Sequence, residues 1–141
     1  MAIMNNLTPL REITKELLRR VSPADLLVGI PCFNNGETVG NVVEAAAAGL
    51  AQYFPGKSAC ILVSDGGSTM DDSREAALAA IKKMNARGVV GIYRGLPGKG
   101  SALRMIVAAA RQLQAEAVAL LDADLRSTTP VWIERLLGPI I

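Results

Sequence analysis

The sequence has 141 residues, of which half are apolar and only 4% are aromatic, and its formal net charge is +2. This length is typical of one domain with a sizeable aliphatic core. The small net charge gives no sign of a nucleic-acid-binding surface, and no basic run indicates a membrane surface. No apolar stretch approaches the ~20 residues of a transmembrane helix and no signal peptide is recognisable, so we expect a cytoplasmic protein. The absence of histidine removes the commonest acid–base side chain.

The first predicted element is a helix over Pro9–Val21. Residues 1–7 before it are expected to be irregular. Thr8 and Pro9 are typical of a helix start, since a hydroxyl caps the helix and proline suits its first position. Apolar residues then recur at helical spacing and predict the buried face: Leu10, Ile13, Leu17 and Val21.

Four short apolar runs follow and alternate with helical patterns. The runs predict strands near residues 26–31, 59–64, 89–93 and 117–122. The patterns between and after them predict four helices: Glu37–Tyr53, Asp71 or Asp72 to about Arg87, Ser101–Gln114 and Val131–Leu137. This alternation predicts an α/β fold with a doubly wound, mostly parallel, Rossmann-like sheet and one extra N-terminal helix. We expect the strand order to reverse between the first and fourth strands and to form a binding crevice there.

The fourth strand leads into two carboxylates, Asp122 and Asp124. In a regular strand, residues two apart point to the same face. Two hard oxygen donors suit Mg²⁺ or Mn²⁺ carrying substrate phosphates. The alternative is a strand end followed by a helix N-cap, where Asp is common. Because parallel strands end at one edge of the sheet, other polar residues at strand ends are expected nearby: Asn34, Asn35, Asp65 and Lys99.

Three common nucleotide and metal motifs are excluded. No G-x-G-x-x-G follows the first strand, which argues against a dinucleotide site. The segment Gly95–Ser101 is not a Walker A loop, because Tyr93 stands where its first glycine is needed and Gly100 directly follows the lysine. Asp122–Asp124 does not begin a calcium loop, because Arg126 occupies the third ligand position.

Four motifs stand at the four strand ends: Pro31-Cys-Phe-Asn-Asn, Val63-Ser-Asp-Gly-Gly-Ser-Thr69, Pro97-Gly-Lys-Gly-Ser-Ala-Leu103 and Leu121-Asp-Ala-Asp-Leu125. In this order and at these places, they resemble the motifs of GT-A glycosyltransferases. The most similar are family 2 enzymes and their relatives that make glucosyl- or mannosylglycerate compounds or polyprenyl-phosphate sugars. The resemblance covers roughly residues 26–137.

The resemblance implies a metal-dependent transfer of a hexosyl group from a nucleotide-diphosphate sugar to an acceptor hydroxyl or phosphate. It places nucleotide-sugar contacts on Pro31, Cys32, Phe33, Asp65, Lys99 and Asp122. It places Mg²⁺ or Mn²⁺ on the D-x-D carboxylates, Asp124 and Asp122. No catalytic residue is identifiable, the acceptor is not indicated, and a homodimer is left open.

The chain departs from the family pattern at two positions. Asn35 stands where the family usually has an acidic residue, and Gly66 where it usually has a second Asp. Glu37 could replace the missing acid or lie in the first turn of a helix, and Arg126 could meet a phosphate or the solvent. Phe33 is expected to pack rather than to stack on a base.

The acceptor-binding half of the family domain, which normally follows the D-x-D segment, has no counterpart in the 141 residues. We therefore expect residues 1–141 to be the nucleotide-sugar-binding half of a single GT-A domain that continues further. Two alternatives stay open. One is a fragment that binds a nucleotide without transferring sugar, and the other is a nucleotidyltransferase, which uses a similar sheet and metal carboxylates.

Overall fold

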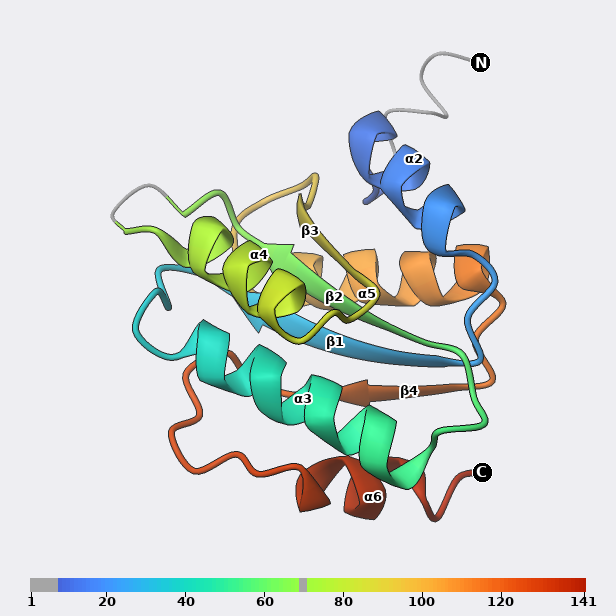
Figure 1. Cartoon of the computed structure of the whole chain (residues 1–141). Helices are drawn as coiled ribbons and strands as arrows, with labels where there is room; N and C mark the ends of the chain where they lie inside the picture. The colour runs from blue at the N-terminus through green and yellow to red at the C-terminus, as the bar shows by residue number, and fades with distance from the viewer. Residues whose placement is uncertain (1–7, 69–70) are drawn as a thin grey trace.

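The computed structural model describes residues 8–68 and 71–141, so the expectation for residues 1–7 and Thr69 of the second motif lie outside the described residues. A four-stranded sheet lies between two helical layers (Figure 1). Its elements in chain order are α2 (Glu12–Val21), β1 (Leu26–Cys32), α3 (Val39–Tyr53), β2 (Ala59–Asp65), α4 (Ser73–Lys83), β3 (Gly88–Ile92), α5 (Lys99–Leu113), β4 (Ala117–Leu120) and α6 (Val131–Leu137). This alternation confirms the α/β class. None of the helices in the described ranges is both long and apolar enough to cross a membrane.

The sheet is parallel throughout, with the strand order β3-β2-β1-β4. The chain steps in one direction from β1 to β3, with α3 and α4 on one face, and then crosses back to β4 through α5 on the other face (Figure 1). Because parallel crossovers are right-handed, a change of direction requires a change of face. The expected reversal of strand order is confirmed, and it leaves a crevice beyond the carboxyl ends of β1 and β4.

The core lies on both faces of the sheet, as the continuous apolar strands predict. Leu26, Val28 and Ile30 of β1 face α3, α4 and α6. Leu27 faces the opposite layer, formed by α2 and α5. Both central strands are therefore fixed by packing from two sides, which gives the loops at their carboxyl ends a rigid base.

The first helix begins later than its sequence predicts. It starts at Glu12 instead of Pro9, because the residues before it bond to the end of β3. The carbonyl of Pro9 accepts the N–H of Arg94 (3.1 Å), and Arg11 Nε donates to the carbonyl of Ile92 (3.0 Å). These tertiary contacts accompany a bend at residues 8–10 and an extended Arg11, so the helix cannot begin before Glu12.

The buried face of α2 also differs from the predicted one. Ile13 is 65% exposed, whereas Thr14 and Leu18 are fully buried. Thr14 lies against Gly91 of β3, where an added Cβ would be 2.6 Å from the threonine Oγ1. The helix therefore approaches the strand at a glycine, and the smaller threonine occupies the contact.

The helix α4 ends at Lys83 and not near Arg87 as expected. Asn85 takes the left-handed conformation, with φ of 50°, and the N–H of Ala86 donates to the carbonyl of Ile81 (3.0 Å). This arrangement is a Schellman-type helix end, for which asparagine is the usual alternative to glycine. The predicted stop at a glycine was wrong because asparagine supplies the same conformation three residues earlier.

Candidate functional site

A pocket of about 450 Å³ opens where the strand order reverses, between the ends of β1 and β4. The loops after β1, β3 and β4 and the first turn of α5 form its wall. The lining includes every predicted site residue except Asn34 and Asp65: Pro31, Cys32, Phe33, Asn35, Tyr93, Pro97, Gly98, Lys99, Ala102, Asp122, Ala123 and Asp124. The fold therefore brings together residues from three loops that are far apart in the sequence.

The D-x-D carboxylates are held by the residue between them. The strand was expected to reach Asp122 but ends at Leu120. Ala123 is only 2% exposed, and its carbonyl accepts a hydrogen bond from Thr38 Oγ1 at 2.6 Å. Burial and the bond from Thr38 fix Ala123. Asp122 and Asp124 on either side of it are exposed on the pocket wall, on one side of the chain as they would be in a strand. No sequence motif predicts this role for Thr38.

Lys99 forms an ion pair across the pocket. Its Nζ lies 2.5 Å from Asp122 Oδ1, and this hydrogen bond, with the charges of Asp122 and Asp124, raises the lysine pKa above its usual value. Both paired side chains are about half exposed, so water screens the contact. Without a ligand, the lysine therefore neutralises one of the two carboxylates while remaining free to exchange partners.

The two carboxylates fit a divalent cation only if a substrate completes its shell. Residues 8–68 and 71–141 contain no cluster of three or more His, Cys, Asp or Glu side chains that could hold a metal ion. Mg²⁺ is commonly held by one or two carboxylates, with water and substrate phosphates as the other ligands. The donor set of Asp122 and Asp124 is suited to an ion that binds together with a diphosphate.

The β1 side of the pocket is neutral and partly apolar. Burial, with a smaller effect of the Asp65 charge, raises the pKa of the Cys32 thiol to about 12. The thiol therefore stays protonated at neutral pH and is unsuited to act as a nucleophile. Phe33, which was expected to pack, is instead 54% exposed and presents an apolar surface to the pocket.

Tyr93 is a pocket residue that the sequence analysis did not identify. Its hydroxyl accepts the N–H of Gly98 (2.9 Å), where φ is 141° and glycine is strongly favoured. A Cβ added to Gly66 would lie 2.8 Å from this hydroxyl and 3.0 Å from Phe33 Cδ1. The departure from the family pattern at Gly66 thus has a steric reason. The available signal was a lone aromatic residue at the end of a predicted strand, directly before a glycine-rich loop.

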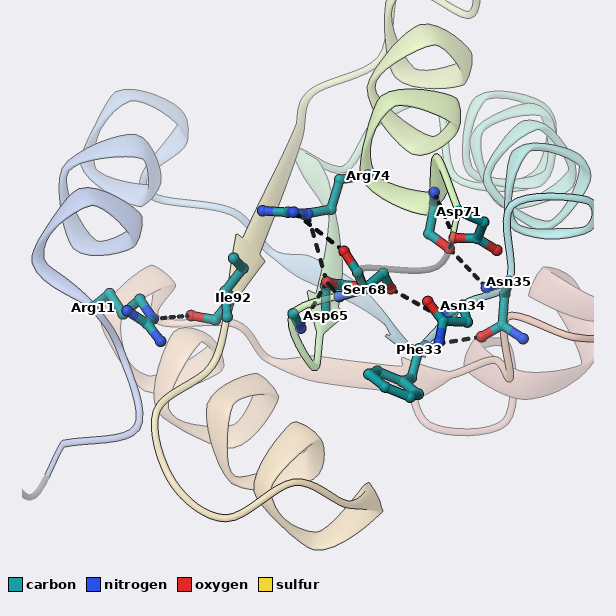
Figure 2. A network of polar contacts seen from close by, with 11 residues as sticks. Arg11, Phe33, Asn34, Asn35, Asp65, Ser68, Asp71, Arg74 and Ile92 are labelled. Atoms are coloured by element: carbon teal, nitrogen blue, oxygen red, sulfur yellow. Dashed lines mark hydrogen bonds and ion pairs between the residues drawn. The ribbon is translucent and has the colours of Figure 1, made fainter.

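Asp65 lies behind the pocket wall and is fully buried. Its carboxylate accepts the N–H of Gly67 (2.8 Å) and both the N–H (2.7 Å) and the hydroxyl (2.6 Å) of Ser68. Arg74 Nε lies 3.7 Å from the same carboxylate (Figure 2). These contacts compensate the buried charge within its own loop, so the structure does not bring Asp65 to the pocket.

Glu37 and Arg126 form a surface ion pair (3.4 Å), and neither residue lines the pocket. The helix α3 begins at Val39, so Glu37 precedes the first turn and does not lie within it. Asn35, the residue at the position that is usually acidic, does line the pocket.

The doubly wound parallel sheet, with paired carboxylates at the point of reversal, is of the GT-A type found in glycosyltransferases. Residues 27–141 match the family model described as "Glycosyl transferase family 2". The chain belongs to this family.

Named relatives and solved structures agree with this assignment. The chain is 32% identical to glucosyl-3-phosphoglycerate synthase of Mycolicibacterium smegmatis over 114 residues, which is 81% of this chain and 35% of that protein. It is 27% identical to the synthase of Mycolicibacterium paratuberculosis, over 81% of this chain and 32% of that protein. A crystal structure of the Mycobacterium tuberculosis synthase with Mn²⁺, UDP-glucose and phosphoglyceric acid superposes with a TM-score of 0.61, at 26% identity over 89% of this chain and 42% of that chain. The chain thus spans about a third of the length of its curated relatives.

Proposed function

We propose that this chain binds the donor of a glycosyl transfer, a nucleotide-diphosphate sugar, through a D-x-D motif and a divalent cation. The observation that carries the proposal is the convergence of Lys99, Asp122 and Asp124 on one pocket of a family 2 domain. The crevice lies at the sheet reversal, where open α/β sheets bind ligands. UDP-glucose is the first donor to test, because related synthases have been crystallised with UDP-glucose and Mn²⁺.

The residues of the pocket divide into two groups by chemistry. Pro31, Cys32 and Phe33 form a neutral wall suited to the nucleoside. Asp122 and Asp124 would hold Mg²⁺ or Mn²⁺ together with the diphosphate, and Lys99 begins α5, where helix amides also favour anions. When bound, the ion would supply positive charge to the departing diphosphate.

In the proposed reaction, an acceptor oxygen bonds to the anomeric carbon, the bond from that carbon to the diphosphate breaks, and the nucleoside diphosphate leaves with the bonding electrons. The acceptor hydroxyl loses its proton to a base, for which we assign no residue of this pocket. The acceptor itself, a homodimer and a cytoplasmic location stay predictions. Phosphoglyceric acid is the acceptor to test first, because it is present with UDP-glucose in a related synthase structure.

A nucleotidyltransferase is less well supported by the first loop, residues 33–36. Such enzymes place a basic, glycine-rich loop after the first strand to bind phosphates. Here all four backbone N–H groups of that loop already donate to side chains of the protein. They are therefore not available to bind a triphosphate unless the loop rearranges.

The test is a calorimetric titration of UDP with and without Mn²⁺. We expect UDP and Mn²⁺ each to strengthen binding of the other by the same factor, because coupling between two ligands is reciprocal. Asp124→Asn should abolish this coupling. Glu37→Gln is the matched control, since it removes an exposed carboxylate outside the pocket, and it should preserve the coupling. A UDP affinity that changes neither with Mn²⁺ nor in Asp124→Asn would contradict the proposed metal role.

A further inference from the structure

The first loop, residues 33–36, is held by side chains at every backbone N–H (Figure 2). The donors and acceptors are Phe33 N to Asn35 Oδ1 (2.9 Å), Asn34 N to Ser68 Oγ (2.9 Å), Asn35 N to Ser73 Oγ (2.7 Å) and Gly36 N to Asp71 Oδ2 (2.8 Å). Two of the four acceptors, Ser68 and Asp71, come from the segment that joins β2 to α4, and a third, Ser73, is the first residue of α4. Two loops that are more than thirty residues apart are therefore joined through side chains.

Each serine in this contact is oriented by an aspartate. Ser68 Oγ donates to Asp65 Oδ1 (2.6 Å), and Ser73 Oγ donates to Asp71 Oδ1 (2.5 Å). A hydroxyl has one proton and two lone pairs, so a serine that donates to a carboxylate presents a lone pair to another donor. The carboxylate thus fixes the hydroxyl as an acceptor for the loop N–H.

We propose that Asp65 and Asp71 are positioning residues that act through Ser68 and Ser73 to hold the first loop in its ligand-binding shape. Asp71 also holds Gly36 N directly, with its second oxygen. The proposal deepens the proposed donor-binding function and rests on it, because two residues of this loop, Phe33 and Asn35, line the pocket. A loop that is ordered before binding loses less conformational freedom when the nucleotide arrives.

The most informative variants are at Asp71 and Ser73, because Asp65 is fully buried and its replacement endangers the fold. Asp71 accepts from Ser73 with one carboxylate oxygen and from Gly36 with the other. Asp71→Asn leaves only one acceptor oxygen, so one of these two contacts is lost. Ser73→Ala removes the acceptor of Asn35 N. Asp72→Asn is the matched control: it makes the same change of charge one residue away, where Asp72 Oδ1 also lies beside Gly36, but the Gly36 N–H donates to Asp71 and Asp72 forms no side-chain cap bond to α4.

The first measurement is amide hydrogen exchange by NMR on the free chain. Asp71→Asn should speed exchange at Gly36, and Ser73→Ala should speed it at Asn35, each by about tenfold, the factor for one lost hydrogen bond. Exchange in β1 and β2 should stay unchanged, which separates a positioning effect from general loss of stability. Exchange at both loop amides no faster than in Asp72→Asn would overturn the proposal.

The second measurement is UDP affinity in the presence of Mn²⁺. Asp71→Asn and Ser73→Ala should each weaken UDP binding several-fold. The affinity loss of the double variant should be smaller than the product of the two single losses, because both residues act on the first loop through the same Asp71–Ser73 contact. Faster loop exchange with unchanged UDP affinity would overturn the positioning role. If the wild-type chain binds no UDP, the proposed function is wrong. The exchange measurement on the free chain still tests whether Asp71 and Ser73 hold the first loop.

Discussion

At the scale of single residues, Lys99 and a metal ion would compete for Asp122. The lysine Nζ lies 2.5 Å from Asp122 Oδ1, so a cation that binds there must displace or share this partner. A nucleoside diphosphate changes the balance, because its phosphates give the lysine another anionic partner. The pair therefore favours joint binding of metal and nucleotide over binding of metal alone.

This competition predicts effects of opposite sign for Lys99→Ala. Mn²⁺ alone should bind more tightly, because Asp122 is released, whereas UDP with Mn²⁺ should bind about tenfold more weakly, because a charge-assisted hydrogen bond is lost. Calorimetry with each ligand measures both effects. The control is Lys83→Ala, which breaks a surface pair with Glu44 on α3 (2.7 Å). If Lys99→Ala leaves both affinities unchanged, Lys99 is a solvated surface residue with no role in binding either ligand.

At the scale of elements, α3 and the turn after β4 are joined by one hydroxyl. Thr38 occupies the N-cap position of α3, but its side chain makes no cap bond to the helix. It donates instead to the carbonyl of Ala123, in a buried contact. The helix thus fixes the D-x-D turn, although the two lie 85 residues apart in sequence.

Replacing Thr38 by valine keeps the shape and removes the bond. We expect Thr38→Val to lower the free energy of unfolding by about 1–3 kcal/mol, because a buried carbonyl loses its partner. Thr14→Val is a matched control, since Thr14 is fully buried and its Oγ1 has no partner within the described residues. It should be neutral or stabilising. Denaturant unfolding measures both, and equal destabilisation by the two variants would contradict this account.

The elements themselves were largely predictable, and their ends were not. Apolar runs such as Leu26–Cys32 identify buried strands because both faces of a parallel sheet are covered. The start of α2 was wrong because Pro9 and Arg11 bond to residues some eighty positions away, which local patterns cannot show. Asp65 was assigned by its motif, but the motif does not reveal that its carboxylate is buried in its own loop.

At the scale of the whole molecule, the pocket offers residues for the proposed donor binding, but we assign no general base in it. The sequence contains no histidine, and the chain spans about a third of the length of its curated relatives. We propose that the groups that orient the acceptor lie outside these 141 residues. Orientation of two reactants can lower a barrier by roughly 7–11 kcal/mol, so its loss would slow transfer severely.

We therefore expect this chain to bind UDP with Mn²⁺ but to transfer glucose to phosphoglyceric acid no faster than background hydrolysis of the donor. Mass-spectrometric detection of product, with binding verified on the same sample, measures this. Turnover near the 1–10³ s⁻¹ that is typical of enzymes would show that the chain holds the complete machinery.

The contact of Gly66 with Tyr93 also constrains the order in which substitutions can accumulate. A side chain at position 66 collides with the tyrosine hydroxyl and with Phe33, so its effect depends on what those positions already hold. An aspartate there, as in the common family motif, requires the Phe33 ring to shift and a smaller residue to replace Tyr93. Such a replacement first gives up the bond to Gly98 that shapes the glycine-rich loop. We therefore expect the two positions to be epistatic, because the cost of a side chain at position 66 depends on the residue at position 93.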